Sequence, residues 1–422
     1  MSDGVLSDHE LRAGARQGWI RAPLPIADEQ FQPASLDLRL GATAYQLRAS
    51  FLPFSQTVHE RLGSDLGQSD LVIDRLSLEA GATLQRGSVY LVPLLESLDL
   101  PPHVRGRSNP KSTTGRLDIF TRVITDRTPR FDEIRAGYVG PLYLEVSPQS
   151  FPVRVRAGLS LNQLRLLTGQ TSLSDVELAR VYGEAPLLHD DEGRPIPVER
   201  ALFNDGLCMG IDLSGASTDG LIGYRAHPNP PAVDLARVGY YDPDEFWEPI
   251  KRPARDSYIL EANRFYILVS KERIRVPPRF AAEMVVYDAG AGEIRTHYAG
   301  FFDPGFGYGD GSIPGTKVVM EVRAREVPFM VYDGQTSFKV WFERLRSRPD
   351  RVYGVGLAEQ KKKETRPTKP AEGGDGAAAS PELAKKGKKI KEDIDKLLDE
   401  IDDILEENAE EFVKSYVQRG GE

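Results

Sequence analysis

The sequence predicts an all-β protein made of two tandem copies of one domain, followed by a charged tail. Short runs of alternating apolar and polar residues recur through residues 36–167, and glycine or proline separates nearly all of them. This is the pattern of strands joined by tight turns. Several motifs then reappear about 175 positions later, and helical windows are few. Many short strands with few helices point to a barrel or a double-sheet fold.

The first copy begins with one expected helix, at residues 8–17, and a proline-rich turn. Alternation then predicts a series of strands. Their expected ranges are 36–40, 71–76, 88–94, 117–124, 142–146, 153–156 and 161–167.

The second copy is recognised from matched motifs. The run Ser-Leu-Asp-Leu-Arg-Leu-Gly at residues 35–41 has a counterpart at 210–215, and the glutamate at position 145 has one at position 321. Most matched pairs lie 175 or 176 positions apart, which is hard to obtain by chance and predicts a duplicated domain. We expect the boundaries to be as follows: first domain 1–175, second domain 176–357, disordered linker 358–380, and an acidic helical or disordered module 381–422.

The composition of the 422-residue chain excludes several classes of protein. Cys208 is the single cysteine, so an intrachain disulfide and a zinc site with several cysteines are excluded. No apolar run approaches the roughly 18 residues of a membrane span, and the N-terminus has no apolar signal core. We therefore expect a cytoplasmic protein. Residues 392–411 hold eleven acidic residues and one lysine, so they account for the net charge of −9. The rest of the chain is therefore close to neutral and can still bind an anion.

The stretch RGRSNPKSTTGRLDIFTRVITD, at residues 105–126, is the strongest candidate for ligand binding. Arginine side chains bind phosphate oxygens in pairs, hydroxyls and exposed N–H groups bind others, and glycine allows close approach of the backbone. The alternative is a basic, solvated hairpin on the surface. The candidate phosphate-binding residues are Arg107, Ser108, Lys111, Ser112, Thr113 and Arg116.

The second copy lacks this basic stretch and carries Ala-Gly-Phe-Phe-Asp-Pro-Gly-Phe at residues 299–306, with Asp303 in a tight turn. Because the basic stretch lies in the first copy and the turn with Asp303 lies in the second, we expect a site shared between the copies or between chains.

Residues 1–357 resemble the dCTP deaminases of the dUTPase-like (β-clip) superfamily, in their long duplicated bacterial form. The resemblance rests on Gln-Pro-Ala-Ser-Leu-Asp-Leu-Arg-Leu-Gly at 32–41, the stretch from Arg107 to Leu117, and the motif at 299–306. It implies hydrolysis of dCTP to dUTP and ammonia, Mg²⁺ accompanying the triphosphate, no zinc, and an oligomer.

The resemblance also implies roles for individual residues. The general base is the glutamate that closes a strand after an Asp-Pro-Gly turn, and two residues fit. Glu321 follows the intact turn at Asp303, whereas Glu145 shares a copy with the basic stretch. Ser112 and Arg116 would act on the attacking water and the triphosphate, and Asp303 on the sugar.

Residues 381–422 resemble the prokaryotic ubiquitin-like protein, Pup. Apolar residues at spacings of 4, 3, 4 and 3 form a heptad seam, and the chain ends in Gly420, Gly421 and Glu422. The resemblance implies a modifier that binds the Pup ligase, the depupylase and the proteasomal ATPase, and whose terminal Glu422 side chain is ligated to lysines. The partner-binding residues would be Ile394, Leu397, Leu398, Ile401, Ile404, Leu405, Phe412 and Tyr416. The alternative is an acidic solubilising helix.

Two other functions remain open from the sequence. In the first, residues 1–357 form a dUTPase, or a bifunctional enzyme that continues from dCTP to dUMP. In the second, they form an inactive scaffold, and the protein serves as a Pup modifier or a proteasome substrate. We expect no nucleic-acid partner and no membrane partner.

Overall fold

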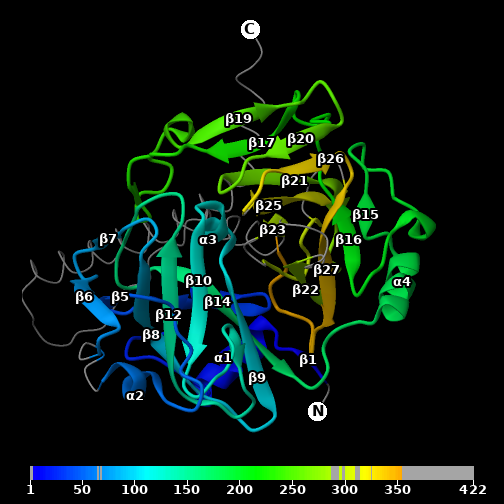
Figure 1. Ribbon diagram of the computed structural model, residues 1–422. Coiled ribbons are helices and arrows are strands. Elements are labelled where there is room, and N and C mark those ends of the chain that lie inside the picture. Colours follow the sequence, from blue (N-terminus) through cyan, green and yellow to red (C-terminus); the bar gives the residue numbers. More distant parts are fainter. Residues whose placement is uncertain are drawn as a thin grey trace, which may run out of the picture.

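The computed structural model describes residues 3–63, 66, 69–286, 294–296, 300–308, 314–324 and 326–353. The expected linker and tail, 358–380 and 381–422, lie outside the described residues. The chain is mostly β, as predicted, and the two copies lie side by side, the first in blue to blue-green and the second in green to orange (Figure 1). None of the described helices has the length and apolar character needed to cross a membrane.

The first copy contains two large sheets and shares a small one with the second copy. The strands of the first sheet are, in spatial order, β11 (Glu133–Ile134), β9 (Val104–Pro110), β14 (Ser160–Thr168), β4 (Ser35–Arg39) and β3 (Phe31–Gln32), with β1 (Gly4–Val5) on β14. Those of the second are β10 (Ile119–Thr125), β12 (Val139–Pro148), β8 (Val89–Asp99), β5 (Thr43–Leu47) and β6 (Val72–Ser77), with β2 (Ile20–Arg21) on β8. The small sheet consists of β18 (Val233–Asp234), β13 (Val153–Val155) and β7 (Ala82–Leu84).

The second copy repeats this arrangement. Its first large sheet has the order β24 (Phe301–Phe302), β22 (Phe280–Val286), β27 (Thr336–Arg344) and β16 (Leu207–Gly210). Its second has the order β23 (Ile294–Thr296), β25 (Thr316–Ala324), β21 (Phe265–Ile274), β17 (Leu221–Ala226) and β19 (Trp247–Lys251), with β15 (Leu188–His189) on β21. A further pair is formed by β20 (Ser257–Leu260) and β26 (Phe329–Tyr332).

The strand orders support the duplication seen in the sequence. The order β9, β14, β4 corresponds to β22, β27, β16, and the order β12, β8, β5 corresponds to β25, β21, β17. Strands β9 and β22 begin and end 176 positions apart, and so do β14 and β27. The offset measured on motifs is therefore also the offset between structural elements.

The described helices are short, and all but α3 begin after a serine or threonine. The described ones are α1 (Asp8–Arg16), α2 (Val58–Leu62), α3 (Ser112–Arg116) and α4 (Asp175–Glu184), with 3₁₀ turns at Asp28–Gln30, Val198–Arg200 and Pro243–Glu245. Helix α1 confirms the predicted helix. In α4, the Ser174 N–H donates to Glu177 at 2.9 Å and the Glu177 N–H donates to the Ser174 hydroxyl at 3.4 Å, which satisfies two N–H groups that the helix leaves free.

The basic stretch 105–126 is divided among three elements, and its last part confirms the strand predicted at 117–124. Its beginning belongs to β9, its middle forms α3, and its end is β10. β9 pairs with β14 from Val104 to Pro110, so the backbone around Arg107 and Ser108 is committed to a sheet. The N–H groups that remain for a ligand are therefore those of the short turn that contains α3.

The two copies share a hydrophobic core. Phe151 of the first copy packs with Phe246 and Trp247, at ring centroid distances of 5.8 and 5.2 Å, and β13 pairs in parallel with β18. The beginning of the chain also contacts the end of the second copy, since the Arg346 N–H donates to Val5 at 2.8 Å. These contacts fix the copies relative to one another, which a site between them requires.

Candidate active site

The turn α3 lies at the boundary between the copies (Figure 1). Pro110 ends β9, and the Thr114 hydroxyl ties the turn to β14 by donating to the Leu161 carbonyl at 2.8 Å. Ser112 is exposed, and Thr113 and Arg116 are half-buried. The hydroxyls and one arginine are therefore accessible to a ligand.

The guanidinium of Arg116 has one nitrogen that lacks a hydrogen-bond partner in the described part of the chain. Its Nε atom is buried and has no hydrogen-bond partner among the described residues. A buried donor without an acceptor costs free energy, and a phosphate oxygen would provide the acceptor. Arg116 acts on one carboxylate of the second copy, that of Glu321.

Glu321 lies on β25 and its side chain is buried, with 4% of the residue exposed. Burial raises the pKa of this carboxyl to about 7, with Asp118 adding to the rise and Arg116 opposing it. No ion pair of Glu321 is found within the described part of the chain. A carboxyl that titrates near neutral pH suits a group that accepts and returns a proton.

Glu145, the other candidate base, has a different environment. It lies on β12, directly opposite Arg122 of β10, and the two form an ion pair in which the Arg122 Nε donates at 2.9 Å. Arg122 is itself fixed, because its guanidinium stacks on the ring of Phe131 at 3.6 Å. The Glu145 carboxylate is therefore already bound to an arginine of its own copy.

Several of the predicted phosphate-binding residues make contacts inside the protein instead. Arg107 forms ion pairs with Glu283 at 3.0 Å and with Glu343 at 2.5 Å, and Lys111 pairs with Asp37. Ser108 donates to Asp132 at 2.6 Å. Glu283 and Glu343 belong to the second copy, so Arg107 joins the copies.

Asp303 belongs to the same set of charges. It lies 3.9 Å from Arg165, and burial raises its pKa to about 6 although Arg165 opposes the rise. Arg165 has no exposed surface, pairs with Glu343 at 3.2 Å and stacks over the Phe301 ring at 3.8 Å. We call this set the inter-copy ion cluster; its members are Asp37, Arg107, Lys111, Arg165, Glu283, Asp303 and Glu343.

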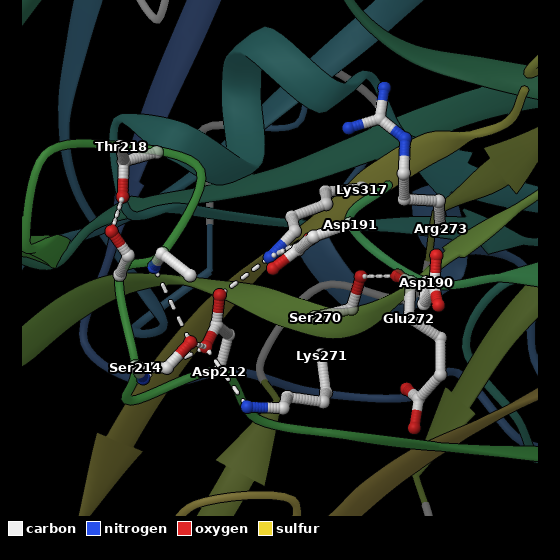
Figure 2. A network of polar contacts seen from close by, with 12 residues as sticks. Asp190, Asp191, Asp212, Ser214, Thr218, Ser270, Lys271, Glu272, Arg273 and Lys317 are labelled. Carbon is white, nitrogen blue, oxygen red and sulfur yellow. Dashed lines mark hydrogen bonds and ion pairs between the residues drawn. The ribbon is translucent and has the colours of Figure 1, made fainter. Parts of the chain in front are cut away.

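The acid of the second copy that corresponds to Asp37 is Asp212, and it lies in a network of polar contacts (Figure 2). Asp212 accepts the Ser214 N–H at 2.8 Å, forms an ion pair with Lys317 and lies 3.5 Å from Lys271. Lys317 also pairs with Asp191 at 2.9 Å. Both lysines already have carboxylate partners, so this network is balanced without a ligand. Asp212 also caps the backbone, because it accepts the Ser214 N–H.

Comparison with solved structures identifies the family. The crystal structure of 2′-deoxycytidine 5′-triphosphate deaminase from Agrobacterium tumefaciens matches with a TM-score of 0.77 and 42% sequence identity, over 85% of this chain and 100% of that chain. The chain belongs to the dCTP deaminase family. The N-terminal domain of dCTP deaminase matches residues 2–170 and the C-terminal domain matches residues 174–365. A dCTP deaminase described as dUMP-forming, from Corynebacterium jeikeium, is 28% identical over 166 residues, 39% of this chain and 81% of that protein.

The dCTP deaminase body is fused to a Pup-like module. The Pup-like family matches residues 356–422. The prokaryotic ubiquitin-like protein Pup of Frankia alni is 62% identical over 52 residues, 12% of this chain and 67% of that protein. All of the predicted conjugation and partner-binding residues lie in this module, outside the described residues: Gly420, Gly421, Glu422, Ile394, Leu397, Leu398, Ile401, Ile404, Leu405, Phe412 and Tyr416.

Within this dCTP deaminase, the predicted site residues divide into two groups. The first group lies on α3: it contains Ser112 and Thr113 at the start of the helix and Arg116 at its end, and Arg116 acts on Glu321. The second group, which contains Arg107, Lys111 and Asp303, belongs to the inter-copy ion cluster. Their roles in binding and catalysis stay predictions. Sequence reasoning gave no role to Asp118, Arg165 or Arg323, which connect the copies; a buried charge in an apolar strand, as at Arg165, was the available signal.

Proposed function

We propose that this protein hydrolyses dCTP to dUTP and ammonia, with Glu321 as the general base. The observation that carries the proposal is the meeting of Arg116, from the first copy, with Glu321, from the second. Arg116 has an unsatisfied nitrogen and Glu321 has a raised pKa without an ion pair. One group suits the triphosphate and the other suits a reacting water, and Arg116 lies close enough to act on the charge of Glu321.

The reaction follows from these two groups. The Glu321 carboxylate would accept a proton from water as the oxygen attacks C4 of cytosine. The same proton, and the second proton of the added oxygen, would then pass to the ring nitrogen and the exocyclic amine, and the C4–N bond would break to release ammonia. Arg116, with the Ser112 hydroxyl, would hold the triphosphate and fix the base against Glu321. A deaminase that activates water through zinc uses a histidine and cysteines, and this chain has one cysteine.

Mg²⁺ would enter with the substrate, bound to the triphosphate. Among the described residues, the grouping of acidic and histidine side chains close enough to hold a metal ion consists of Asp8, His9 and Asp350, and it includes neither Glu321 nor a residue of α3. The residues of α3 are basic and hydroxyl-bearing, which suits phosphate oxygens and leaves Mg²⁺ coordinated by the substrate and water.

The activity is tested by incubating the full chain with dCTP and Mg²⁺ and measuring ammonia and dUTP. Release of both in equal amounts supports the deaminase, and an absence of both would favour the inactive scaffold. A second candidate function is a bifunctional enzyme, favoured by the similarity to the dUMP-forming dCTP deaminase of Corynebacterium jeikeium. Pyrophosphate and dUMP as products distinguish that reaction.

Replacing Arg116 by alanine is expected to weaken dCTP binding by about 30-fold or more. Loss of one partner from a buried charged contact costs about 2 kcal/mol or more, and each 1.4 kcal/mol is about tenfold. Calorimetric titration with dCTP and with deoxycytidine measures the effect, which we expect for the triphosphate and not for the nucleoside. Arg105→Ala is the matched control, because Arg105 is at the start of β9 and donates to the Gly169 carbonyl at 3.2 Å; equal losses in both variants would contradict the role of Arg116.

We propose that the Pup-like module is recognised by the Pup ligase, the depupylase and the proteasomal ATPase, through its apolar seam, and that Glu422 is the conjugated residue. Deletion of Gly420, Gly421 and Glu422 is expected to abolish conjugation by Pup ligase and ATP, and to leave dCTP turnover unchanged. Gel shift of an acceptor protein measures conjugation. Conjugation at an unchanged rate would contradict the assignment of the terminus.

A deoxynucleotide triphosphate substrate and Pup partners would place the protein in the cytoplasm. Each copy would be a dUTPase-like (β-clip) domain, with boundaries at 1–175 and 176–357. We propose that chains assemble into an oligomer, as the family resemblance implies, and that neither nucleic acid nor membrane is a partner.

A further inference from the structure

Asp118 connects the turn that carries Arg116 to the strand that carries Glu321. It follows Arg116 by two positions, and its side chain is fully buried. Its carboxylate accepts a hydrogen bond from the Ser150 hydroxyl at 2.6 Å and forms an ion pair with Arg323 of the second copy. Arg323 is held from the other side as well, because its Nη1 donates to the Asn263 carbonyl at 2.7 Å.

The backbone of Asp118 also fixes the end of α3. Its φ angle is +53°, in the left-handed region that aspartate and asparagine tolerate better than most residues. Its N–H donates to the Gly115 carbonyl at 2.8 Å, and its carbonyl accepts the Gln149 N–H at 2.9 Å. Arg116 lies inside this closed turn, so its position depends on Asp118.

Arg323 and Glu321 are two positions apart on β25, so their side chains leave the same face of the strand. In the first copy, the corresponding glutamate, Glu145, forms an ion pair with Arg122. In the second copy, the arginine nearest to Glu321 along the strand is bound to Asp118 instead. Arg323 has no counterpart in the first copy, because the residue 176 positions before it is Ser147.

We propose that Asp118 and Arg323 form a positioning pair, which docks α3 on β25 and keeps the carboxylate of Glu321 free of an arginine partner. This inference rests on the proposed function of Glu321 as the base. Neither residue of the pair is assigned contact with the substrate. Their effect on the reaction passes through Arg116 and Glu321.

Removal of either charge of the pair is expected to shift the pKa of Glu321, in opposite directions for the two residues. The charged groups that act on Glu321 are Arg116 and Asp118, from the side of α3, and Arg323 is its neighbour on β25; the residue opposite on β21 is Ile267, which is apolar. The intact pair is neutral. Loss of the Asp118 charge leaves Arg323 cationic and lowers the pKa of Glu321, whereas loss of the Arg323 charge leaves Asp118 anionic and raises it.

The test compares Asp118→Asn, Arg323→Gln, the double variant and Arg323→Lys. A general base is active when deprotonated, so kcat/KM rises with pH through the pKa of the free enzyme's base. We expect the acidic limb of this profile to move down in Asp118→Asn and up in Arg323→Gln, each by roughly 0.5 pH unit or more. In the double variant, the acidic limb should return towards its position in the unaltered protein. In Arg323→Lys, it should keep that position. Shifts in one direction for both single variants, or none in folded protein, would overturn the proposal.

A second readout separates this inference from the proposed function. Infrared difference spectra against Glu321→Gln follow the protonation of the Glu321 carboxyl without any turnover. If the unaltered protein releases no ammonia, the proposed function fails, and the infrared titration of the same variants still decides whether the pair controls Glu321. If Asp118→Asn does not fold, the comparison of Arg323→Gln with Arg323→Lys decides the outcome, because these variants differ in charge at one position.

Discussion

Glu321→Gln is expected to lower kcat for dCTP deamination by about 10²–10⁴-fold, the usual contribution of a positioned acid or base. Glutamine keeps the size and a hydrogen-bonding oxygen of the side chain, but cannot accept the proton of the attacking water. Binding of dCTP should survive, since Arg116 and the hydroxyls of α3 are unchanged. Single-turnover measurements of ammonia release, with calorimetric titration of dCTP, give the two quantities separately.

Glu145→Gln is the matched control for this substitution, because it changes the corresponding residue of the other copy. Its ion pair with Arg122 gives it a role in the stability of the second sheet of the first copy. We therefore expect Glu145→Gln to lower the thermal midpoint and to retain most of the turnover per folded molecule. The reverse pattern, with Glu145→Gln inactive and Glu321→Gln active, would move the base to the first copy.

Arg165→Met is expected to destabilise the folded protein by about 3–5 kcal/mol, the usual cost of removing one member of a buried ion pair. Arg165 is fully buried. Its loss would leave the carboxylates of Glu343 and Asp303 without their closest cation from β14. Burial alone would raise the pKa of Glu343, and Arg165 together with Arg107 and Thr171 holds it below its usual value. Urea unfolding at pH 7, followed by circular dichroism, measures the change.

Arg194→Met is the control for that experiment, because it makes the same change in an exposed arginine. Arg194 pairs with Asp190 and Glu192 at the surface, where ion pairs contribute little to stability. If Arg165→Met shifts the urea midpoint no more than Arg194→Met does, the inter-copy ion cluster is not what holds the two copies together.

Most of the fold could be predicted because the strands alternate in the ordinary way. The strand β14, for example, places Leu161, Leu164 and Leu166 in the core, and its predicted range differs from the observed one by a residue at each end. β9 was missed because its side chains include Arg105, Arg107 and Ser108, which look like a polar loop. The partner of Arg107, Glu343, is 236 positions away, and a local pattern does not contain that contact.

The candidate site was predicted in its residue types but not in its pairings. The basic stretch and both glutamates were found, yet the sequence left Glu321 and Glu145 as alternatives because they occupy corresponding positions in the two copies. Each was expected to close a strand, and each lies three residues before the end of one. The distinction lies in the neighbouring strand, where Arg122 faces Glu145 across the pair formed by β10 and β12. Three residues that connect the copies, Asp118, Arg165 and Arg323, gain their significance only when the copies are placed together.

The turn α3 and the strand β25 belong to one polypeptide, so the meeting of Arg116 with Glu321 is completed by folding and does not wait for two chains to collide. Their effective concentration is set by the fold and does not change on dilution. Two defective chains, one altered at Arg116 and the other at Glu321, would consequently have no means of complementing each other when mixed, unless they exchanged an entire copy.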